Sequence, residues 1–285
     1  MSSPAVKVQG PKRAIAICAD DYGVDQNVDR AIVDLAMQGR LTATSVLVDA
    51  AIDPESIRAL DQVNMDVGLH LNFSEVLGEL SVDAVMPLSH LIVRSHARLL
   101  SRQWVRASIE RQLSRFKVLL GRSPNYVDGH LHVHQLPVIR DELLQALGAQ
   151  ALPPGFWLRD TRAGDLSGSP WAEQFKSWVV SHLGMGTLVA MAAGQRIGLN
   201  HGFFGVYDFT AEHRPFMQMM AGWLAKANAG SLVMTHPSCQ ALPGDPIGAA
   251  RVIEYQALGS QVFGELLEKE AITLVRPSQV LSSLP

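Results

Sequence analysis

Short apolar runs that end in polar residues alternate along this 285-residue chain with longer amphipathic segments. The first run, residues 14–19, precedes a helix-like stretch at 28–38 that Gly39 closes. Such alternation indicates parallel strands joined by helical crossovers. Further strands are predicted at 44–48, 67–71, 126–133, 156–159, 203–207, 231–235 and 272–275, and further helices at 104–120, 138–147, 215–227 and 255–269.

About eight parallel strands fit either a (β/α) barrel or an open doubly wound sheet, and we favour the barrel. Its site would lie at the C-terminal ends of the strands, where polar residues gather in this sequence. The length and the 47% hydrophobic content suit one domain, predicted at 13–285 after a tail at 1–12. The segment 73–102 is expected to be a long loop with short elements over the site.

Composition narrows the classes of function. The formal charge of −3 gives no reason to expect nucleic acid or an anionic membrane as partner, and the absence of a Gly-rich phosphate loop after the first strand disfavours nucleotide binding. Cys18 and Cys239 are too few for a disulfide framework, which favours a reducing, cytoplasmic location. No apolar run is long enough for a membrane span or resembles a signal peptide. We therefore expect chemistry on a small molecule.

The run from Asp128 to His134 carries a carboxylate and three imidazoles at every second position: Asp128, His130, His132 and His134. In a strand these four side chains would share one face. Three of the ten histidines fall within five residues, which favours a metal or catalytic site over separate hydrogen-bonded histidines. Along a strand they would span roughly 13 Å, so that one or two at most could bind one ion unless the chain bends.

Other candidates end separate strands. Asp20 and Asp21 start on opposite faces of their strand, so one could bind a metal while the other stands beside its water, or one could cap a helix or form a turn. His70 is a ligand or a packed polar residue, and His236 a proton donor or a loop histidine. One carboxylate and two imidazoles from three strand ends would leave room for water and a substrate oxygen, as a hydrolytic metal site requires.

Taken together, these motifs resemble the YdjC-like carbohydrate deacetylases, which include chitooligosaccharide and hopanoid-associated deacetylases. The motifs run in family order over residues 13–276. They are Ala19-Asp20-Asp21-Tyr22-Gly23, Gly68-Leu69-His70-Leu71-Asn72, Asp128-Gly129-His130-Leu131-His132-Val133-His134 with Pro137, Leu158-Arg159 and Thr235-His236-Pro237. The resemblance implies a deformed TIM-like (β/α) barrel of α/β class in a single domain, one divalent metal ion, and hydrolysis of an N-acetyl group on an amino sugar.

By position, the resemblance assigns Asp21, His70 and His130 as metal ligands, Asp20 as the general base and His236 as the acid. Arg159 would hold Asp20 or the substrate. Four further residues are expected to support the ligands or contact the substrate: His132, His134, Asn72 and Asp128. The ligand set suits Zn²⁺, Mg²⁺ or Mn²⁺.

This chain departs from the family pattern in two ways. Tyr22 stands where Phe is more usual, and the segments 73–102 and 171–202 align with nothing in the family. Because these segments would shape the sugar pocket, the N-acetylated sugar itself is not identified, whether oligosaccharide or glycolipid head group.

Two rival functions remain. Amidohydrolases and phosphoesterases on similar barrels also use His-x-His motifs, but an amidohydrolase would carry that motif on its first strand, where this chain has Asp20 and Asp21. A non-catalytic sugar-binding barrel would need a broken ligand set, and here every expected position is filled. A monomer and a homodimer both stay open.

Overall fold

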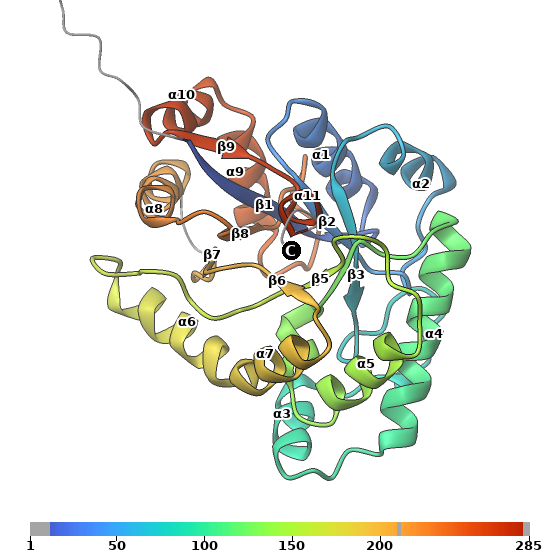
Figure 1. Ribbon diagram of the computed structural model, residues 1–285. Helices are drawn as coiled ribbons and strands as arrows, with labels where there is room; N and C mark the ends of the chain where they lie inside the picture. The colour runs from blue at the N-terminus through green and yellow to red at the C-terminus, as the bar shows by residue number, and fades with distance from the viewer. Residues whose placement is uncertain (1–11, 210–211, 282–285) are drawn as a thin grey trace, which may run out of the picture.

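Nine parallel strands form one curled sheet in the computed structural model, which describes residues 12–209 and 212–281. Eight follow the order β6-β5-β4-β3-β2-β1-β8-β7, and β9 pairs with the beginning of β1 (Figure 1). The ends of this path, β6 and β7, are not paired with each other in the described ranges, although Ala163, after β5, bridges to Phe203 of β7. The predicted deformed, single-domain (β/α) barrel is therefore confirmed. The strands are β1 (Arg13–Tyr22), β2 (Ala43–Val46), β3 (Asp66–Leu71), β4 (Tyr126–Gly129), β5 (Trp157–Leu158), β6 (Gly198–Leu199), β7 (Phe203–Phe204), β8 (Leu232–Thr235) and β9 (Ile272–Leu274).

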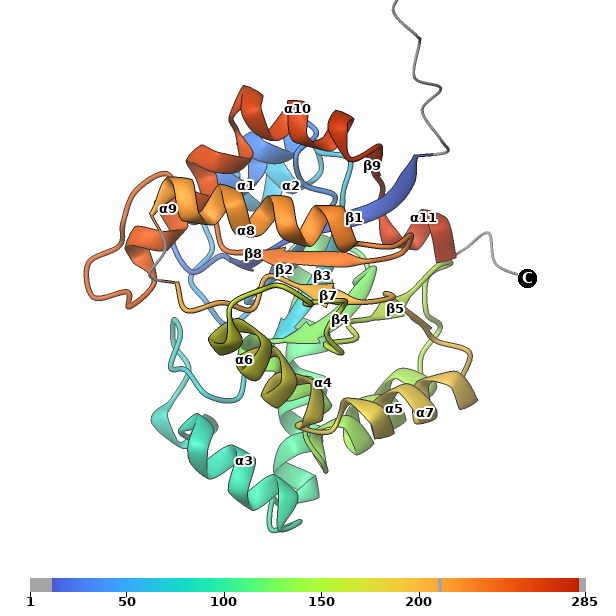
Figure 2. The ribbon, with the colours of Figure 1, turned by 90° about the vertical axis from the view of Figure 1, so that its left-hand side faces the viewer.

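Helices pack around the outside of the sheet, with α1, α2 and α8 to α10 above it and α3 to α7 below it in Figure 2. Their bounds are α1 (Gln26–Met37), α2 (Pro54–Leu60), η1 (Val82–Ala84), α3 (Leu88–His96), α4 (Arg102–Leu120), η2 (His130–Gln135), α5 (Ile139–Gly148), α6 (Trp171–His182), α7 (Met185–Gly194), α8 (His213–Lys226), α9 (Gly248–Leu258), α10 (Gln261–Lys269) and α11 (Pro277–Leu281).

Alternation along the strands separates the apolar shell from the barrel interior. In β1, Ile15 and Ile17 join the large core under the helices, whereas Ala16 and Cys18 join a smaller cluster with Tyr126 and other inward residues. The same alternation turns Ala19 outward and Asp20 inward. The interior is thus apolar at its base and polar towards the C-terminal ends of the strands.

The predicted strand 126–133 is wrong beyond Gly129. Leu131 and His132 adopt left-handed backbone, with φ of 52° and 61°, and the chain turns into η2. A Cβ atom on Gly129 would lie 2.8 Å from the backbone nitrogen of His134, so this fold-back requires glycine. The period of two therefore does not place the three histidines on one face.

Other boundaries also differ from the prediction. The strand predicted at 203–207 ends at Phe204, because Gly205 has a φ of 98°, and a Cβ atom there would lie 2.2 Å from the carbonyl oxygen of Met234. The helix predicted at 255–269 is two helices, since Ser260 caps α10 by accepting a hydrogen bond from the amide of Phe263. The helices α6 and α7 were not predicted.

The segment 73–102 contains η1 and α3, as expected of a loop with short elements. The predicted tail at 1–12 lies outside the described residues except for Lys12. Among the described helices, none alone is long and apolar enough to cross a bilayer. Only α6 and α7 taken together, across a 47° bend, reach that length and composition.

A stability prediction arises at the start of α1, where burial raises the pKa of Asp29 from 3.8 to about 6 although the amide of Gly23 donates a hydrogen bond to it. Between those two values the unfolded carboxyl is ionised and the folded one is protonated, so the free energy of unfolding falls as pH rises from about 4 to about 6. Asp29→Asn removes this loss and should gain up to about 3 kcal/mol on the wild type between pH 4 and pH 7.

Urea unfolding at pH 4, 5, 6 and 7 measures this difference, with the exposed Asp61→Asn as the matched control. Parallel pH curves for the wild type and Asp29→Asn would contradict the prediction.

Candidate metal and catalytic site

A cavity of about 790 Å³ opens at the C-terminal ends of the strands. Six of the predicted site residues line it: Asp20, Asp21, His70, His130, His132 and His236. Much of the remaining wall is aliphatic, with Leu88 and Ile92 from α3 and Val179 and Leu183 from α6 and its end. The segment 73–102 therefore covers the site as expected.

Asp21, His70 and His130 converge at the floor of this cavity. The Oδ1 atom of Asp21 lies 3.5 Å from Nε2 of His70 and 3.2 Å from Nδ1 of His130. One ligand-type atom from each of the three residues lies within 4.8 Å of the others, a spacing that could hold one metal ion. Asp21 reaches this position because its backbone is left-handed, with a φ of 71°, where the pairing of β1 with β2 shifts register.

The orientation of His70 suits a metal ligand. Its Nδ1 lies 2.7 Å from Oδ1 of Asp128, a residue with no exposed surface. A carboxylate at that nitrogen fixes the proton there and leaves Nε2 free to face Asp21. Gly68, two residues earlier, is needed because a Cβ atom there would lie 2.4 Å from the ring of Tyr126. This carboxylate–imidazole pair is an arrangement typical of metal-binding histidines.

Neighbouring carboxylates stabilise a positive charge at the point where Asp21, His70 and His130 meet. Burial alone would lower the pKa of His130, but hydrogen bonds from its ring to Asp21 and Glu75 raise it to about 10. Burial would raise the pKa of Asp21, yet His130 and Arg251 outweigh burial and hold it well below its usual range. The Asp21 carboxylate is therefore ionised and available to a cation.

Asp20 lies deeper in the barrel, clamped by Arg159. Both guanidinium Nη atoms contact its carboxylate at 2.5 Å, and Arg159 also lies 2.5 Å from Asp128. Burial would raise the pKa of Asp20, but the guanidinium outweighs it and holds the carboxyl ionised. Cys18, Asp20 and Asp128 also have metal-ligand spacing, but Arg159 already supplies the cation between them.

His236, after β8, is half-buried at the cavity wall. Its backbone amide donates a hydrogen bond to Glu254, its ring packs edge-on to Phe209 with centroids 5.2 Å apart, and its Nδ1 has no partner among the described residues. Burial lowers the pKa of His236 to about 4, so the ring is neutral at neutral pH.

One of the other predicted residues lines the cavity, and two hydrogen-bond to the backbone around it. His132 lines the cavity and packs edge-on to Phe203, 5.5 Å between centroids. His134 does not line it, and its Nε2 lies 3.0 Å from the carbonyl oxygen of Arg159. Asn72 accepts hydrogen bonds from the amides of Ser74 and Glu75, which shapes the turn that carries Glu75 to His130.

Two residues of the site were missed by sequence reasoning. Arg251 of α9 donates to Oδ2 of Asp21 at 2.7 Å and to Asp245 at 2.6 Å, which leaves Oδ1 of Asp21 facing the imidazoles. Glu75 places Oε1 3.0 Å from Nε2 of His130. Neither residue belongs to a motif or a strand end, so no signal in the sequence marked them.

His134→Ala should keep metal binding intact, because His134 faces Arg159 rather than the cavity. The substitution leaves the buried carbonyl of Arg159 without its partner and should lower the free energy of unfolding by about 2 kcal/mol. Metal content after dialysis and urea unfolding measure the two effects, with the exposed His182→Ala as control. Loss of the ion from folded His134→Ala would show that His134 is a ligand.

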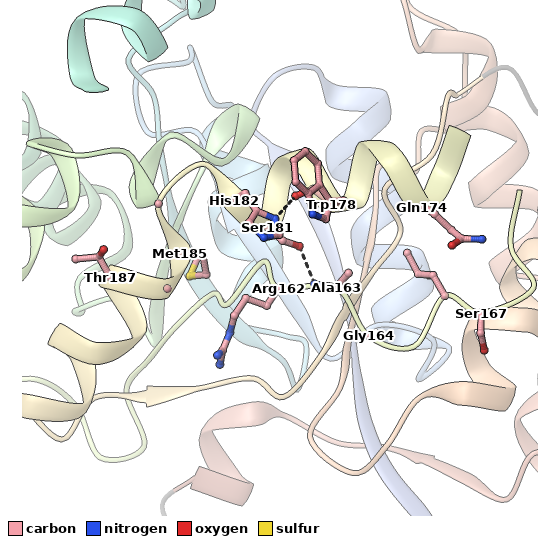
Figure 3. A pocket seen from close by; sticks show the side chains of 13 residues that line it. Arg162, Ala163, Gly164, Ser167, Gln174, Trp178, Ser181, His182, Met185 and Thr187 are labelled. Atoms are coloured by element: carbon pink, nitrogen blue, oxygen red, sulfur yellow. Dashed lines mark hydrogen bonds between the residues drawn. The ribbon is translucent and has the colours of Figure 1, made fainter. Parts of the chain in front are cut away.

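A second hollow of about 710 Å³ lies on the other side of α6 and contains none of the predicted ligands (Figure 3). Arg162, Ser181, Trp178 and His182 contribute to its wall, and Ser181 Oγ accepts a hydrogen bond from the amide of Ala163. The converging carboxylate and imidazoles lie in the first cavity instead.

The fold and the site define a class of deformed parallel (β/α) barrels that bring one carboxylate and two imidazoles together at their strand ends with metal-ligand spacing. Within that class, residues 14–269 match the family model described as "YdjC-like protein", and the chain belongs to this family.

Curated relatives carry related names. The chain is 33% identical over 150 residues to a mouse carbohydrate deacetylase, covering 49% of this chain and 48% of the relative. It is 27% identical over 157 residues to a chitooligosaccharide deacetylase of Serratia marcescens, covering 50% of this chain and 58% of the relative. The matched stretch thus spans about half the length of these relatives.

Solved structures share the fold. A putative cellobiose-phosphate cleavage protein from Enterococcus faecalis superposes with a TM-score of 0.66 at 17% identity, over 94% of this chain and 99% of that one. A peptidoglycan N-acetylglucosamine deacetylase superposes with a TM-score of 0.51 at 13% identity, over 93% and 86%.

Proposed function

We propose that this chain is a metal-dependent hydrolase that removes the N-acetyl group from an amino sugar and releases acetate. The observation that carries the proposal is the convergence of Asp21, His70 and His130 beside the ionised Asp20 in one cavity. The family and the names of its curated relatives support an acetamide as the bond that is cleaved.

The donor set fits a divalent ion. Asp21, His70 and His130 would hold it, and Asp128 keeps the correct nitrogen of His70 free. When bound, the ion would polarise the acetamide carbonyl and lower the pKa of water. One carboxylate and two imidazoles suit Zn²⁺, Mn²⁺ and Mg²⁺, and all three stay candidates.

Asp20 would act as the general base. Its carboxylate lines the cavity, and Arg159 keeps it ionised and fixes its position. Such a carboxylate can accept the proton of the water that attacks the acetamide carbon. Because the ion pair with Arg159 stabilises the ionised carboxylate, it also weakens Asp20 as a base. Asp20 must therefore pass the proton on readily.

His236 would carry that proton to the leaving nitrogen, which is a poor leaving group until it is protonated. Its neutral ring lines the same cavity and has an unpartnered Nδ1. A neutral imidazole can receive a proton at one nitrogen and donate one from the other. Acetate and a free amine then leave.

Acetate release tests the proposal. Metal-free protein is reloaded separately with Zn²⁺, Mn²⁺ or Mg²⁺ and assayed on N-acetylglucosamine oligomers, diacetylated disaccharides and N-acetylated glycolipid head groups. We expect acetate with at least one ion. Phosphate release from a phosphorylated sugar, with no acetate, would favour a phosphoesterase, and sugar binding without release under any ion would favour a binding barrel.

The remaining predictions concern the cellular location, the partners and the oligomeric state of the chain. Both cysteines are free thiols, in agreement with a reducing compartment, and we propose that the chain acts in the cytoplasm. We expect no nucleic-acid partner. Whether the chain is a monomer or a homodimer stays open to measurement by light scattering.

A further inference from the structure

The cavity that holds the candidate metal ligands has a polar floor and an apolar wall. The carboxylates and imidazoles gather at the strand ends, and three segments stand around them: α3, the end of α6, and the loop before α9. The aliphatic side chains that these segments contribute are called the apolar wall: Leu88, Ile92, Val179, Leu183, Leu242 and Ile247. All six are half-buried, so each keeps part of its surface uncovered.

Two more apolar side chains line the cavity from an unfavourable backbone conformation. Leu131 and Phe209 have φ of 52° and 57°, in the left-handed region that bulky residues rarely adopt. Leu131 is also 44% exposed, although it directly follows the candidate ligand His130. Backbone strain of this kind is concentrated at ligand-binding sites. The strain here presents apolar surface to the cavity beside the catalytic groups.

Hydrogen-bonding side chains are absent from the part of the wall that α3 and α6 form, among the described residues that line the cavity. In the third segment, Asp245 is already held by Arg251. Apart from the histidines, Phe209 is the one aromatic residue among the described lining residues. A second sugar unit against α3 and α6 would therefore bury hydroxyl groups without partners, at a cost of about 1–3 kcal/mol for each.

We propose that the N-acetylated sugar carries an aliphatic aglycone, which lies along the apolar wall while the acetamide lies at the floor. The inference rests on the proposed function and names its substrate class: a glycolipid-type glycoside instead of an oligosaccharide. A volume of about 790 Å³ is within the range of roughly 300–1,000 Å³ that holds a ligand larger than one sugar. Burial of aliphatic surface against the wall would supply the affinity.

Titration calorimetry on the metal-free protein tests the aglycone without turnover. The ligands are the methyl, butyl, hexyl and octyl β-glycosides of N-acetylglucosamine, each below its micelle concentration, and diacetylchitobiose. We expect Kd to fall by about threefold for each added methylene until the wall is covered. Diacetylchitobiose should bind no more tightly than the methyl glycoside, because α3 and α6 offer its second ring no hydrogen bonds.

The double variant Val179→Ser/Ile247→Ser removes apolar surface from two segments of the wall. It should bind the octyl glycoside about tenfold more weakly and the methyl glycoside as the wild type does. Both residues lie outside the two packed apolar cores, so the variant should fold. The matched control is Val93→Ser/Val262→Ser, whose exposed side chains do not line the cavity. The control should bind every glycoside as the wild type does.

Acetate release from the metal-loaded protein separates this inference from the proposed function. Release from no glycoside, with an octyl gain that only Val179→Ser/Ile247→Ser loses, would refute the deacetylase and leave the aliphatic ligand standing. Three results would overturn the inference even if the methyl glycoside releases acetate: equal affinity for the methyl and octyl glycosides, equal weakening in both double variants, or tighter binding of diacetylchitobiose than of the octyl glycoside.

Discussion

Asp20→Asn is expected to lower kcat by about 10²–10⁴-fold while the metal ion stays bound. An amide can hydrogen-bond the attacking water but cannot accept its proton. The ligand atoms are unchanged, since Asp20 faces Arg159 rather than His70 and His130. KM should change little, because the substitution removes a group needed in the transition state and leaves the rest of the cavity intact.

Metal content and steady-state kinetics of the reloaded protein measure this effect. Asp49→Asn is the matched control, since Asp49 is also a buried carboxylate paired with an arginine, Arg111, but lies outside the cavity. Near-normal acetate release by Asp20→Asn would remove the base from the mechanism, and His132 would be the next candidate. An Asp20→Asn protein that folds but cannot hold the ion would exchange the roles of the two carboxylates.

Asp21→Asn should lose both the ion and the activity, with partial recovery at high metal concentration. Oδ1 of Asp21 faces both His70 and His130, and the substitution can leave an amide nitrogen, which is no ligand, in its place. His70→Ala and His130→Ala should lose the ion as well. Stoichiometric metal in all three purified variants would refute the assignment.

A smaller effect on metal binding is expected for Asp128→Asn, which alters the residue that hydrogen-bonds to the ligand His70. It should weaken metal binding by about 10–100-fold, because Nδ1 of His70 loses its carboxylate. Circular dichroism must show that the variant folds, since Asp128 also contacts Arg159 and Ser45. Unchanged metal affinity would mean that Asp128 serves the barrel interior alone.

Local patterns in the sequence determined the framework. The period of two in β1 put Asp20 inside the barrel, and strand ends followed by helices predicted the parallel curled sheet. Parallel strands all end on one side, so polar residues at the C-terminal ends of β1, β3, β4 and β8 had to meet at one rim. This rule does not depend on which side chains contact one another, and for that reason motifs on separate strands indicated a common site.

Only the tertiary structure determined the features that depend on reversals of the backbone and on contacts between side chains far apart in the chain. The left-handed residues at Asp21 and His132 turned a supposed strand of histidines into a bend and brought the second carboxylate to the imidazoles. Arg251, 230 positions from Asp21, fixes which of its oxygens faces them. A left-handed residue other than glycine costs about 1–2 kcal/mol locally and persists only where long-range packing outweighs that cost. The local sequence therefore could not determine it.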